Sequence, residues 1–220
     1  MIITTHTGGI KIKIIVIGAH PDDYELGMAG AILKHVNNGD EVYGIVATNG
    51  AMLLDRKAKK NVRVEEAKKS AKALGIKKMF YLGLKDTQVS SSHKTIKLIE
   101  EIVKKIRPQR IYTHSLNDTH QDHHNLSKAV IVGARKIKQV LFYESPSSDN
   151  KFSPTYFIEL SEEALNQKVE VMKLHKSLLN LKRRYLEIGA IKAGASFRGY
   201  QVNLNYAEGF EVFRYVEEVD

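Results

Sequence analysis

The sequence contains no cysteine among its 220 residues. Disulfide bonds, thiolate zinc sites and cysteine nucleophiles are therefore excluded, and histidine and carboxylate side chains remain as the strong metal ligands. Long apolar runs are also absent, since the longest covers residues 14–17, with Gly18 and Ala19 after it. A membrane-spanning helix needs about 20 apolar residues, so we expect no membrane span. Residues 1–9 lack the cationic flank, apolar core and cleavage site of a secretory leader, so we expect a cytoplasmic protein.

Basic residues exceed acidic ones, with 34 lysines and arginines against 25 aspartates and glutamates and a formal net charge of +9. The excess falls in small clusters, such as residues 56–60 and 182–184, which are typical of solvated helix faces. A nucleic-acid surface would interleave these cations with aromatic side chains or carry a known recognition module, and the sequence has neither. No nucleic-acid partner is expected, and an anionic small substrate stays open.

Apolar patterning places strands and helices in alternation along the first two thirds of the chain. A β-branched run at residues 13–20 and a second at 41–48 flank residues 29–36, whose apolar side chains have helical spacing. The same reading predicts helices at 61–74, 93–106 and 126–134 and strands at 79–82, 110–114 and 140–143. Repeated βαβ units predict an α/β, Rossmann-like fold with a mostly parallel twisted sheet flanked by helices.

The pattern changes after residue 146. It predicts strands at 155–160 and 209–216, a helical stretch at 161–190, and irregular loops at 146–155 and 191–205 that rim a pocket. Only one short stretch is rich in serine and proline, which leaves little chain for a second core. We therefore expect a single domain at residues 1–220, with an α/β core at 1–145 and a C-terminal rim and closing strand at 146–220.

Two polar loops follow predicted strands. Residues 20–23 (HPDD) come after the first strand, and residues 117–124 (NDTHQDHH) come after the strand at 110–114. In doubly wound sheets, ligands bind outside the carboxyl ends of the strands. Clustered carboxylates repel one another and raise each other's pKa, and a divalent metal removes that conflict. Two histidines and one aspartate, with one position open for water, are typical ligands of catalytic zinc.

Residue spacing fits such a site but leaves one ligand open. His20 and Asp23 lie three residues apart in a turn that enters a helix, whereas His120 shares a helical face with both His123 and His124. Each loop taken alone is equally well interpreted as a turn and a helix N-cap. The metal interpretation is favoured because both loops fall at strand ends of one sheet.

A dinucleotide site is the other candidate at the end of the first strand. Gly18, Gly27 and Gly30 do not form a G-x-G-x-x-G fingerprint, and Asp22 and Asp23 would repel a pyrophosphate there. The sequence also lacks a P-loop and a G-x-S-x-G nucleophile elbow. A dinucleotide cofactor is therefore not expected.

The two polar loops carry a resemblance to a known family. Residues 18–23 (GAHPDD) with 25–27 (ELG), and residues 120–123 (HQDH), resemble the specific motifs of the LmbE-like, or PIG-L, family of zinc-dependent N-acetylglucosaminyl de-N-acetylases. Further matches extend the resemblance over nearly the whole chain, at Arg63, Glu66, 74–75 (LG), 82–86 (LGLKD) and 206–210 (YAEGF). The resemblance implies a hydrolase that removes the N-acetyl group from an N-acetylglucosamine-containing small molecule or glycoconjugate.

The resemblance also implies a metal site. One zinc ion per chain would be held by His20, Asp23 and His123, which selects His123 over His124 as the second histidine ligand. Amide hydrolysis needs an activated water, a polarised carbonyl and a proton for the departing amine. Zinc would supply the first two of these.

Proton transfer and substrate binding fall to four other residues by the same resemblance. Asp22 would be the general base, and His120 the general acid or oxyanion stabiliser. The carboxylate of Asp122 would hydrogen-bond to His120, orient it and raise its pKa. Arg63 would bind a polar or anionic part of the substrate.

The chain departs from the family at residues 175–178 (HKSL), where a His-x-Ser-Gln signature is usual. A surface histidine on a helix is therefore at least as good an interpretation of His175 as a role in the site. Two other functions are weighed on the same fold. A metal-dependent phosphoesterase suits the net charge and Arg63, but two-metal hydrolysis needs more bridging carboxylates. A non-catalytic sugar- or metal-binding protein would not need Asp22 and His120 together. An exposed C-terminal helix could also join copies into a homo-oligomer.

Overall fold

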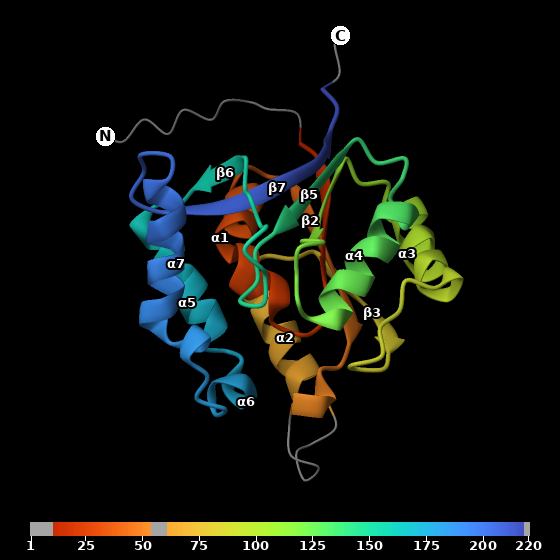
Figure 1. Cartoon of the computed structure of the whole chain (residues 1–220), viewed down its shortest axis with the longest axis horizontal. Helices are drawn as coiled ribbons and strands as arrows, with labels where there is room; N and C mark the ends of the chain where they lie inside the picture. Colours follow the sequence, from red (N-terminus) through yellow and green to blue (C-terminus); the bar gives the residue numbers. More distant parts are fainter. Residues whose placement is uncertain (1–10, 54–60, 218–220) are drawn as a thin grey trace.

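The computed structural model describes residues 11–53 and 61–217, and within them seven strands form one sheet in the order β3-β2-β1-β4-β5-β7-β6 (Figure 1). The strands are β1 (Lys13–Gly18), β2 (Glu41–Thr48), β3 (Lys78–Leu84), β4 (Arg110–His114), β5 (Gln139–Tyr143), β6 (Tyr156–Glu159) and β7 (Ala207–Tyr215). The first five pair in parallel, and β7 pairs antiparallel with both β5 and β6. The predicted α/β fold with a mostly parallel sheet is confirmed. The expectations for residues 1–9 and 56–60 lie outside the described residues.

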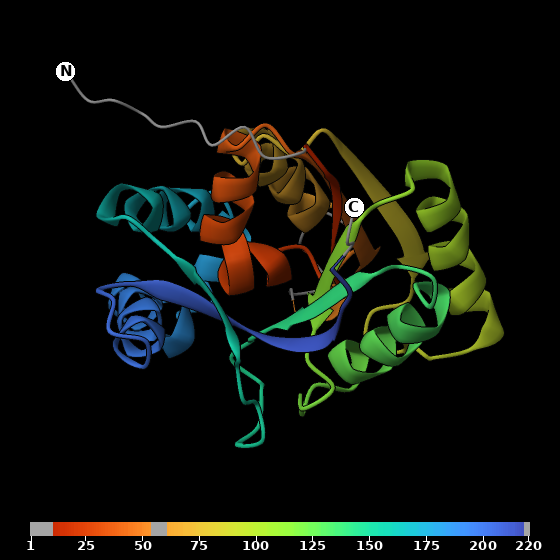
Figure 2. The same cartoon turned by 90° about the horizontal axis from the view of Figure 1, so that it is seen from above.

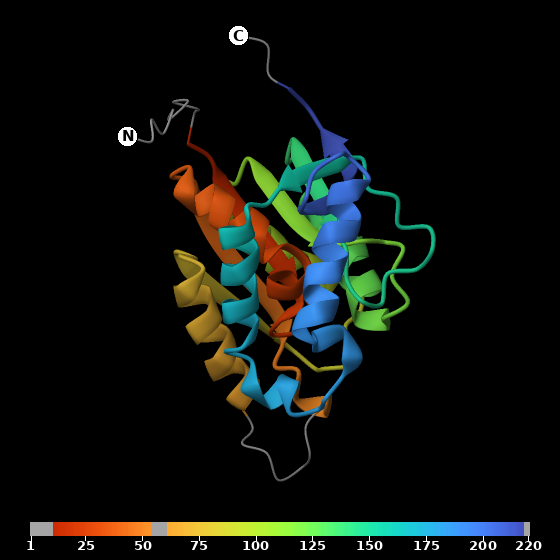
Figure 3. The same cartoon turned by 90° about the vertical axis from the view of Figure 1, so that its left-hand side faces the viewer.

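Helices cover both faces of the sheet. The helices are α1 (Asp23–Asn37), α2 (Val62–Ala73), α3 (His93–Ile106), α4 (Gln121–Gly133), α5 (Glu162–Met172), α6 (Lys176–Leu179) and α7 (Ile188–Tyr200), with single 3₁₀ turns at Ala51–Leu53 and Arg184–Leu186. Helices α1, α2 and α5 lie on one face, and α3 and α4 lie on the other (Figure 2). Figure 3 shows α2, α5 and α7 side by side on the first face. No helix among the described residues is long and apolar enough to cross a membrane.

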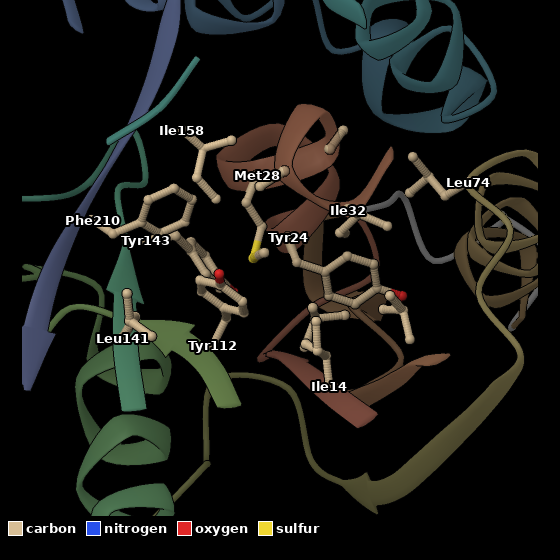
Figure 4. Close-up of a cluster of buried hydrophobic side chains, with 14 of the residues drawn as sticks. Ile14, Tyr24, Met28, Ile32, Leu74, Tyr112, Leu141, Tyr143, Ile158 and Phe210 are labelled. Atoms are coloured by element: carbon tan, nitrogen blue, oxygen red, sulfur yellow. The ribbon is translucent and has the colours of Figure 1, made fainter. Parts of the chain in front are cut away.

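Strand β1 is buried on both faces, which explains its continuous apolar run. Ile14 and Val16 pack with the side chains of α1 in one core, in which Figure 4 labels Ile14, whereas Ile15 and Ile17 pack with α3 and α4 in a second core. Successive side chains of a strand point to opposite faces, so one apolar run supplies both cores. The apolar run therefore places the end of β1, and the loop after it, at the centre of the sheet.

Three helices differ from the sequence prediction. Helix α1 starts at Asp23 rather than at residue 29, and α4 starts at Gln121 rather than at residue 126. Both first turns were missed because they carry the polar side chains of the two loops. Helix α7 occupies most of the predicted loop at 191–205, which was wrong for residues 191–200. Glycines lower helix propensity, but a Cβ at Gly199 would meet the backbone nitrogen of Tyr206 at 2.7 Å. This glycine permits close packing and does not end the helix.

The C-terminal part completes the sheet of the N-terminal part. Strand β7 lies between β5 and β6, and Glu208 on it accepts hydrogen bonds from the backbone N–H groups of Gly30 (3.1 Å) and Ala31 (2.7 Å). Met28 has non-helical backbone angles, so α1 is kinked there. A kink interrupts the helical hydrogen bonds, and Glu208 satisfies the N–H groups that follow it. This contact ties the closing strand to the helix that begins at the candidate site.

Candidate active site

The two polar loops meet at the carboxyl ends of β1 and β4. These strands are neighbours in the sheet, and the strand order reverses between them. Such a reversal is where ligands bind in doubly wound sheets. The ring centroids of His20, after β1, and His123, on α4, are 5.3 Å apart. The fold therefore brings together residues that are 103 positions apart in the chain.

Three side chains meet at the spacing of a tetrahedral metal site. Nδ1 of His20 lies 3.3 Å from Nε2 of His123. One carboxylate oxygen of Asp23 lies 3.4 Å from Nδ1 of His20, and the other lies 3.5 Å from Nε2 of His123. Zinc–nitrogen bonds of about 2.0–2.1 Å in a tetrahedron separate neighbouring ligand atoms by about 3.3–3.4 Å. These three residues therefore lie close enough together to hold a divalent metal ion, with the two oxygens of Asp23 facing different histidines.

Donor atoms gather here in wider groups as well. Within the described residues, three groups of possible ligands each contain His20, His123 or both, namely His20/His120/His123, Asp23/His114/His123 and His20/Asp86/Asp122. A hydrogen bond from the backbone N–H of Asp122 occupies Nδ1 of His120. The Asp23 carboxylate brings the negative charge that a divalent cation needs. We therefore take Asp23 as the better third partner of His20 and His123.

Two carboxylates orient the ring of His20. Its Nε2 lies 3.2 Å from Asp86 and 3.3 Å from Asp122, which leaves Nδ1 facing His123 and Asp23. A carboxylate on the second ring nitrogen of a metal-binding histidine fixes the ring and its tautomer. Burial disfavours the imidazolium, but the surrounding carboxylates, led by Asp23, raise the pKa of His20 to about 12. The carboxylates thus stabilise a proton on His20, at a position where a metal cation could bind in its place.

His123 is oriented in the same way by Asp118. Nδ1 of His123 lies 3.0 Å from the carboxylate of Asp118, which also accepts hydrogen bonds from the hydroxyl groups of Ser145 and Ser147. Burial opposes the imidazolium, but Asp23 and Asp118 raise the pKa of His123 to about 9. Its neighbour His124 points elsewhere and bonds through Nδ1 to the carbonyl oxygen of Leu116 (2.8 Å). The structure therefore places His123, and not His124, in the cluster.

Asp23 is fixed by contacts on one oxygen. Its Oδ2 accepts the backbone N–H of His20 at 2.7 Å and lies 3.0 Å from Nε2 of His114. Burial raises the pKa of a carboxyl group, but His123 and His114 hold the pKa of Asp23 well below its usual value. Asp23 is therefore charged throughout the physiological range. Burial, followed by the charge of His123, lowers the pKa of His114 to about 4.

Asp22 has a strained backbone and a buried cationic partner. Its φ of 124° lies in a region that side chains rarely adopt. Arg63 donates a short hydrogen bond to its carboxylate and a second, of 2.9 Å, to the carbonyl oxygen of Pro21. Burial raises the pKa of Asp22 to about 6, against the opposing charge of Arg63. A carboxylate with this pKa is charged at neutral pH and still a useful base.

Arg63, predicted to bind substrate, lies buried beside Asp22. Its side chain is only 2% exposed, and its other terminal nitrogen donates to the carbonyl oxygen of Gly50 (2.8 Å). The guanidinium group therefore holds the HPDD loop, and its contact with substrate stays a prediction. A Cβ at Gly50 would lie 2.3 Å from this guanidinium group, so the glycine makes room for it.

His120 lies beside the cluster, but its predicted contact with the Asp122 carboxylate does not form. Its ring stacks on His123 with a centroid distance of 4.4 Å. The Asp122 carboxylate instead accepts hydrogen bonds from the backbone of Thr87 (2.7 Å) and Val89 (3.1 Å). Asp122 orients His120 through its backbone N–H, which donates to Nδ1 (3.2 Å). Burial and the charge of His123 lower the pKa of His120, in contrast to the predicted rise.

His175 is fully buried, so its interpretation as a surface histidine was wrong. Its Nε2 lies 3.4 Å from Glu25, which raises its pKa against the effect of burial. Glu66 on α2 accepts hydrogen bonds from the N–H (2.9 Å) and hydroxyl (2.5 Å) groups of Ser177. The chain retains the histidine and the serine of the His-x-Ser-Gln signature, and the bonds of Ser177 to Glu66 tie α6 to α2.

Three residues near the cluster were not predicted. His114 and Asp118 lie in or after β4, and Asp86 lies in the 82–86 stretch after β3. Their position at the ends of neighbouring parallel strands was a usable signal. What the sequence could not supply was the direction of each side chain, because this depends on contacts across the sheet.

Comparisons with known proteins agree with this site. The model of the family described as GlcNAc-PI de-N-acetylase (PIG-L) matches residues 15–133. An uncharacterized deacetylase, YaiS, of Escherichia coli (strain K12) is 34% identical over 170 residues, which are 74% of this chain and 90% of the relative. The diacetylchitobiose deacetylase of Thermococcus kodakarensis is 25% identical over 224 residues, covering 90% of this chain and 81% of that protein.

A solved structure shares the fold. The N,N'-diacetylchitobiose deacetylase from Pyrococcus horikoshii superposes with a TM-score of 0.81 at 22% sequence identity, covering 91% of this chain and 83% of that one. The matched family stretch contains the HPDD loop, Arg63 and the loop of His120 to His123. The chain therefore belongs to the PIG-L family of de-N-acetylases, enzymes that hydrolyse amide bonds other than peptide bonds.

Proposed function

We propose that this protein is a zinc-dependent hydrolase that removes the N-acetyl group from an N-acetylglucosamine-containing small molecule. One zinc ion per chain is held by His20, Asp23 and His123. The spacing of their donor atoms, 3.3–3.5 Å, carries the proposal. The names of the relatives support the substrate class, since two of them are deacetylases of diacetylchitobiose.

The metal supplies one part of the chemistry. A zinc ion, when bound, acts as a Lewis acid that activates water and polarises an amide carbonyl. The residues of this chain hold it in place. His20 and His123 each have a carboxylate on the second ring nitrogen, which keeps the facing nitrogen in position.

Asp22 takes up the proton of the attacking water. Burial raises its pKa to about 6, so it is deprotonated at pH 7 and can still accept a proton. Arg63 holds the carboxylate in place through its short hydrogen bond. The strained backbone at Asp22 is thereby kept in one conformation.

His120 donates a hydrogen bond to the oxyanion that forms from the amide carbonyl. Its Nδ1 accepts the backbone N–H of Asp122, so the ring proton sits on Nε2. Burial and the charge of His123 lower the pKa of His120, which keeps the ring neutral at pH 7. The stacking of its ring on His123 holds it beside the candidate ligands. The proton that Asp22 takes from the water passes to the departing amine.

The chain works as one domain in this proposal. The described residues up to 145 form the α/β core that carries the chemistry, and the described residues after 145 form the rim and the closing strand. The insertion of β7 between β5 and β6 supports a single domain, because the second part cannot leave the sheet without breaking it.

The proposed function is tested by removing the metal from the protein and then adding zinc back. Protein stripped with a chelator should release no amine from N-acetylglucosamine derivatives, and about one equivalent of zinc per chain should restore the release. Without metal, His20 and His123 are protonated at pH 7, so zinc binding should release about two protons. Calorimetry in buffers of different ionisation enthalpy counts these protons. If zinc bound but no amine were released, the proposed metal site would stand and the proposed reaction would be overturned.

A further inference from the structure

A cavity of about 460 Å³ opens between α5, α6, the 3₁₀ turn at Arg184–Leu186 and the start of α7. Figure 1 shows these three helices together at one side of the molecule. The candidate metal ligands lie on other elements, and the proposed mechanism uses none of the residues that line this cavity. Pockets for drug-sized ligands measure about 300–1,000 Å³, so the cavity is large enough for one small molecule.

Buried apolar side chains form the floor of the cavity. Met172, Leu186 and Ile191 line it and are 1%, 4% and 7% exposed. They belong to an apolar cluster that packs α5, α6 and α7 against one another, so the floor is part of the folded core of this region. Ile188, at the first position of α7, also lines the cavity but is 47% exposed. An apolar ligand in the cavity would remove this side chain from water.

The rim of the cavity carries more positive than negative charge. Its charged residues are Lys173, Lys182, Arg183 and Glu187, and all four are exposed. Lys173 already has a carboxylate partner, Glu170, at 2.6 Å. In the described part of the chain, no carboxylate forms an ion pair with Lys182 or Arg183. Two unpaired cations against the one carboxylate of Glu187 leave an excess of positive charge at the rim.

The two levels of the cavity together define a class of ligand. A guanidinium group binds a carboxylate through two parallel N–H donors, and Lys182 adds a second cation next to Arg183 in the chain. The apolar floor lies behind this exposed rim. A ligand that matches both levels has an anionic head and an apolar tail. A single chain can reach the recessed floor, whereas the flat surface of a lipid bilayer cannot.

We propose that this cavity binds a free single-chain amphiphile with a carboxylate head, such as a medium-chain fatty acid. The carboxylate lies between Lys182 and Arg183, and the tail lies along Met172, Leu186 and Ile191. The site goes beyond the proposed function and does not depend on it, because no candidate metal ligand lines the cavity.

Two neighbouring arginines give a matched test of the head group. Arg183 lines the cavity and Arg184 does not, and both side chains are exposed. Decanoate is the probe, and calorimetric titration below its micelle concentration measures its Kd. Arg183→Gln should raise the Kd about tenfold or more, because a hydrogen bond between charged groups is lost. Arg184→Gln removes the same charge one residue away and should change the Kd less than about twofold.

A second pair of variants tests the tail. Ile188→Ser removes an exposed apolar side chain from the cavity, whereas Tyr200→Ser removes one that is 72% exposed at the other end of α7, outside the cavity. Ile188→Ser should raise the Kd of decanoate about three- to tenfold, and Tyr200→Ser should leave it unchanged. Acetate, which lacks the tail, and decyltrimethylammonium, which has a cationic head, should each bind about tenfold more weakly or less.

Four results would overturn the proposal. The first is that wild type does not bind decanoate, including the case in which the protein is retained on phosphatidylglycerol vesicles instead. The second is an equal loss of affinity in Arg183→Gln and Arg184→Gln, which would show a general effect of charge. The third is binding of decyltrimethylammonium as tight as that of decanoate. The fourth is a wild-type dimer in sedimentation that Ile188→Ser separates into monomers, because a second copy of the chain would then cover the cavity.

Discussion

The N-terminal α/β part and the C-terminal part handle charge in opposite ways. The candidate ligands in the first part form a cluster whose carboxylates raise the pKa of His20 to about 12 and that of His123 to about 9. In the second part, Lys168 and Arg198 are each paired with a carboxylate, Glu208 and Glu144. The first arrangement suits a metal ion, whereas the second leaves neither of these two cations unpaired.

The match to the family model also separates the N-terminal part from the C-terminal part. It ends at residue 133, before β5, β6, β7 and the helices α5 to α7. The residues that carry the proposed chemistry lie in the part that the chain shares with the family model. Substitutions of these residues should therefore affect every substrate.

The largest expected effect is loss of the metal. His123→Ala removes one of three candidate ligands, so zinc content should fall to background and activity on all acetylated sugars should disappear. The neighbouring substitution His124→Ala is the control, because this ring bonds to the carbonyl oxygen of Leu116 and does not face the cluster. Metal analysis beside amine release checks both variants. Full zinc occupancy in His123→Ala would contradict the ligand assignment.

Removal of the base should lower activity and keep the metal. Asp22→Asn preserves the shape of the side chain but cannot accept a proton, so kcat should fall about 100- to 10,000-fold. Zinc content should stay near that of wild type, in contrast to Asp23→Ala, where it should drop. A fully active Asp22→Asn protein would show that another group takes the proton.

Substitutions of Arg63 distinguish a positioning role of this residue from a role in substrate binding. Asp22 must be deprotonated to act, so activity should fall as the pH drops through about 6. The charge of Arg63 lowers the pKa of Asp22, so Arg63→Gln should raise this pKa and move the acid limb to higher pH, by about 1 unit or more. Arg63→Lys, which keeps the charge, should move the limb less.

The separate effects of the Arg63 substitutions on kcat and on KM complete this test. A positioning role for Arg63 predicts that kcat and the pH profile change while KM stays close to wild type. If Arg63→Gln raised KM and left the acid limb in place, the original substrate-binding prediction would be favoured instead. Zinc content serves as the control for an intact loop.

The smallest expected effect concerns packing in the C-terminal part. A Cβ at Gly199 would lie 2.7–2.8 Å from backbone atoms of Asn205 and Tyr206, so Gly199→Ala should lower the free energy of unfolding by about 1–3 kcal/mol. Gly194→Ala on the same helix meets open space and should raise it by about 0.5–1 kcal/mol. Denaturant unfolding measures both. Zinc content should be unaffected, and its loss in Gly199→Ala would show that the two parts are coupled more tightly than proposed.

Much of the fold could be predicted because its signals are local. The apolar runs of β1 and β2 and the helical spacing of α3 lie within short stretches, and the observed bounds of β2 and α3 match the predicted ones. Helix α7 was missed because its glycines indicate a loop locally. The close contact of Gly199 appears only when α7 packs against the chain that enters β7.

The sequence by itself determined that two polar loops follow two strands and that no cysteine competes with them for a metal. It also determined which residue types could bind a cation. Only the tertiary structure decided which atoms face one another. It turned His123 inward, set Arg63 on Asp22 and buried His175 against Glu25. The reason is that such contacts join residues far apart in the chain, as His20 and Asp122 are 102 positions apart, and no local pattern encodes a direction across the sheet.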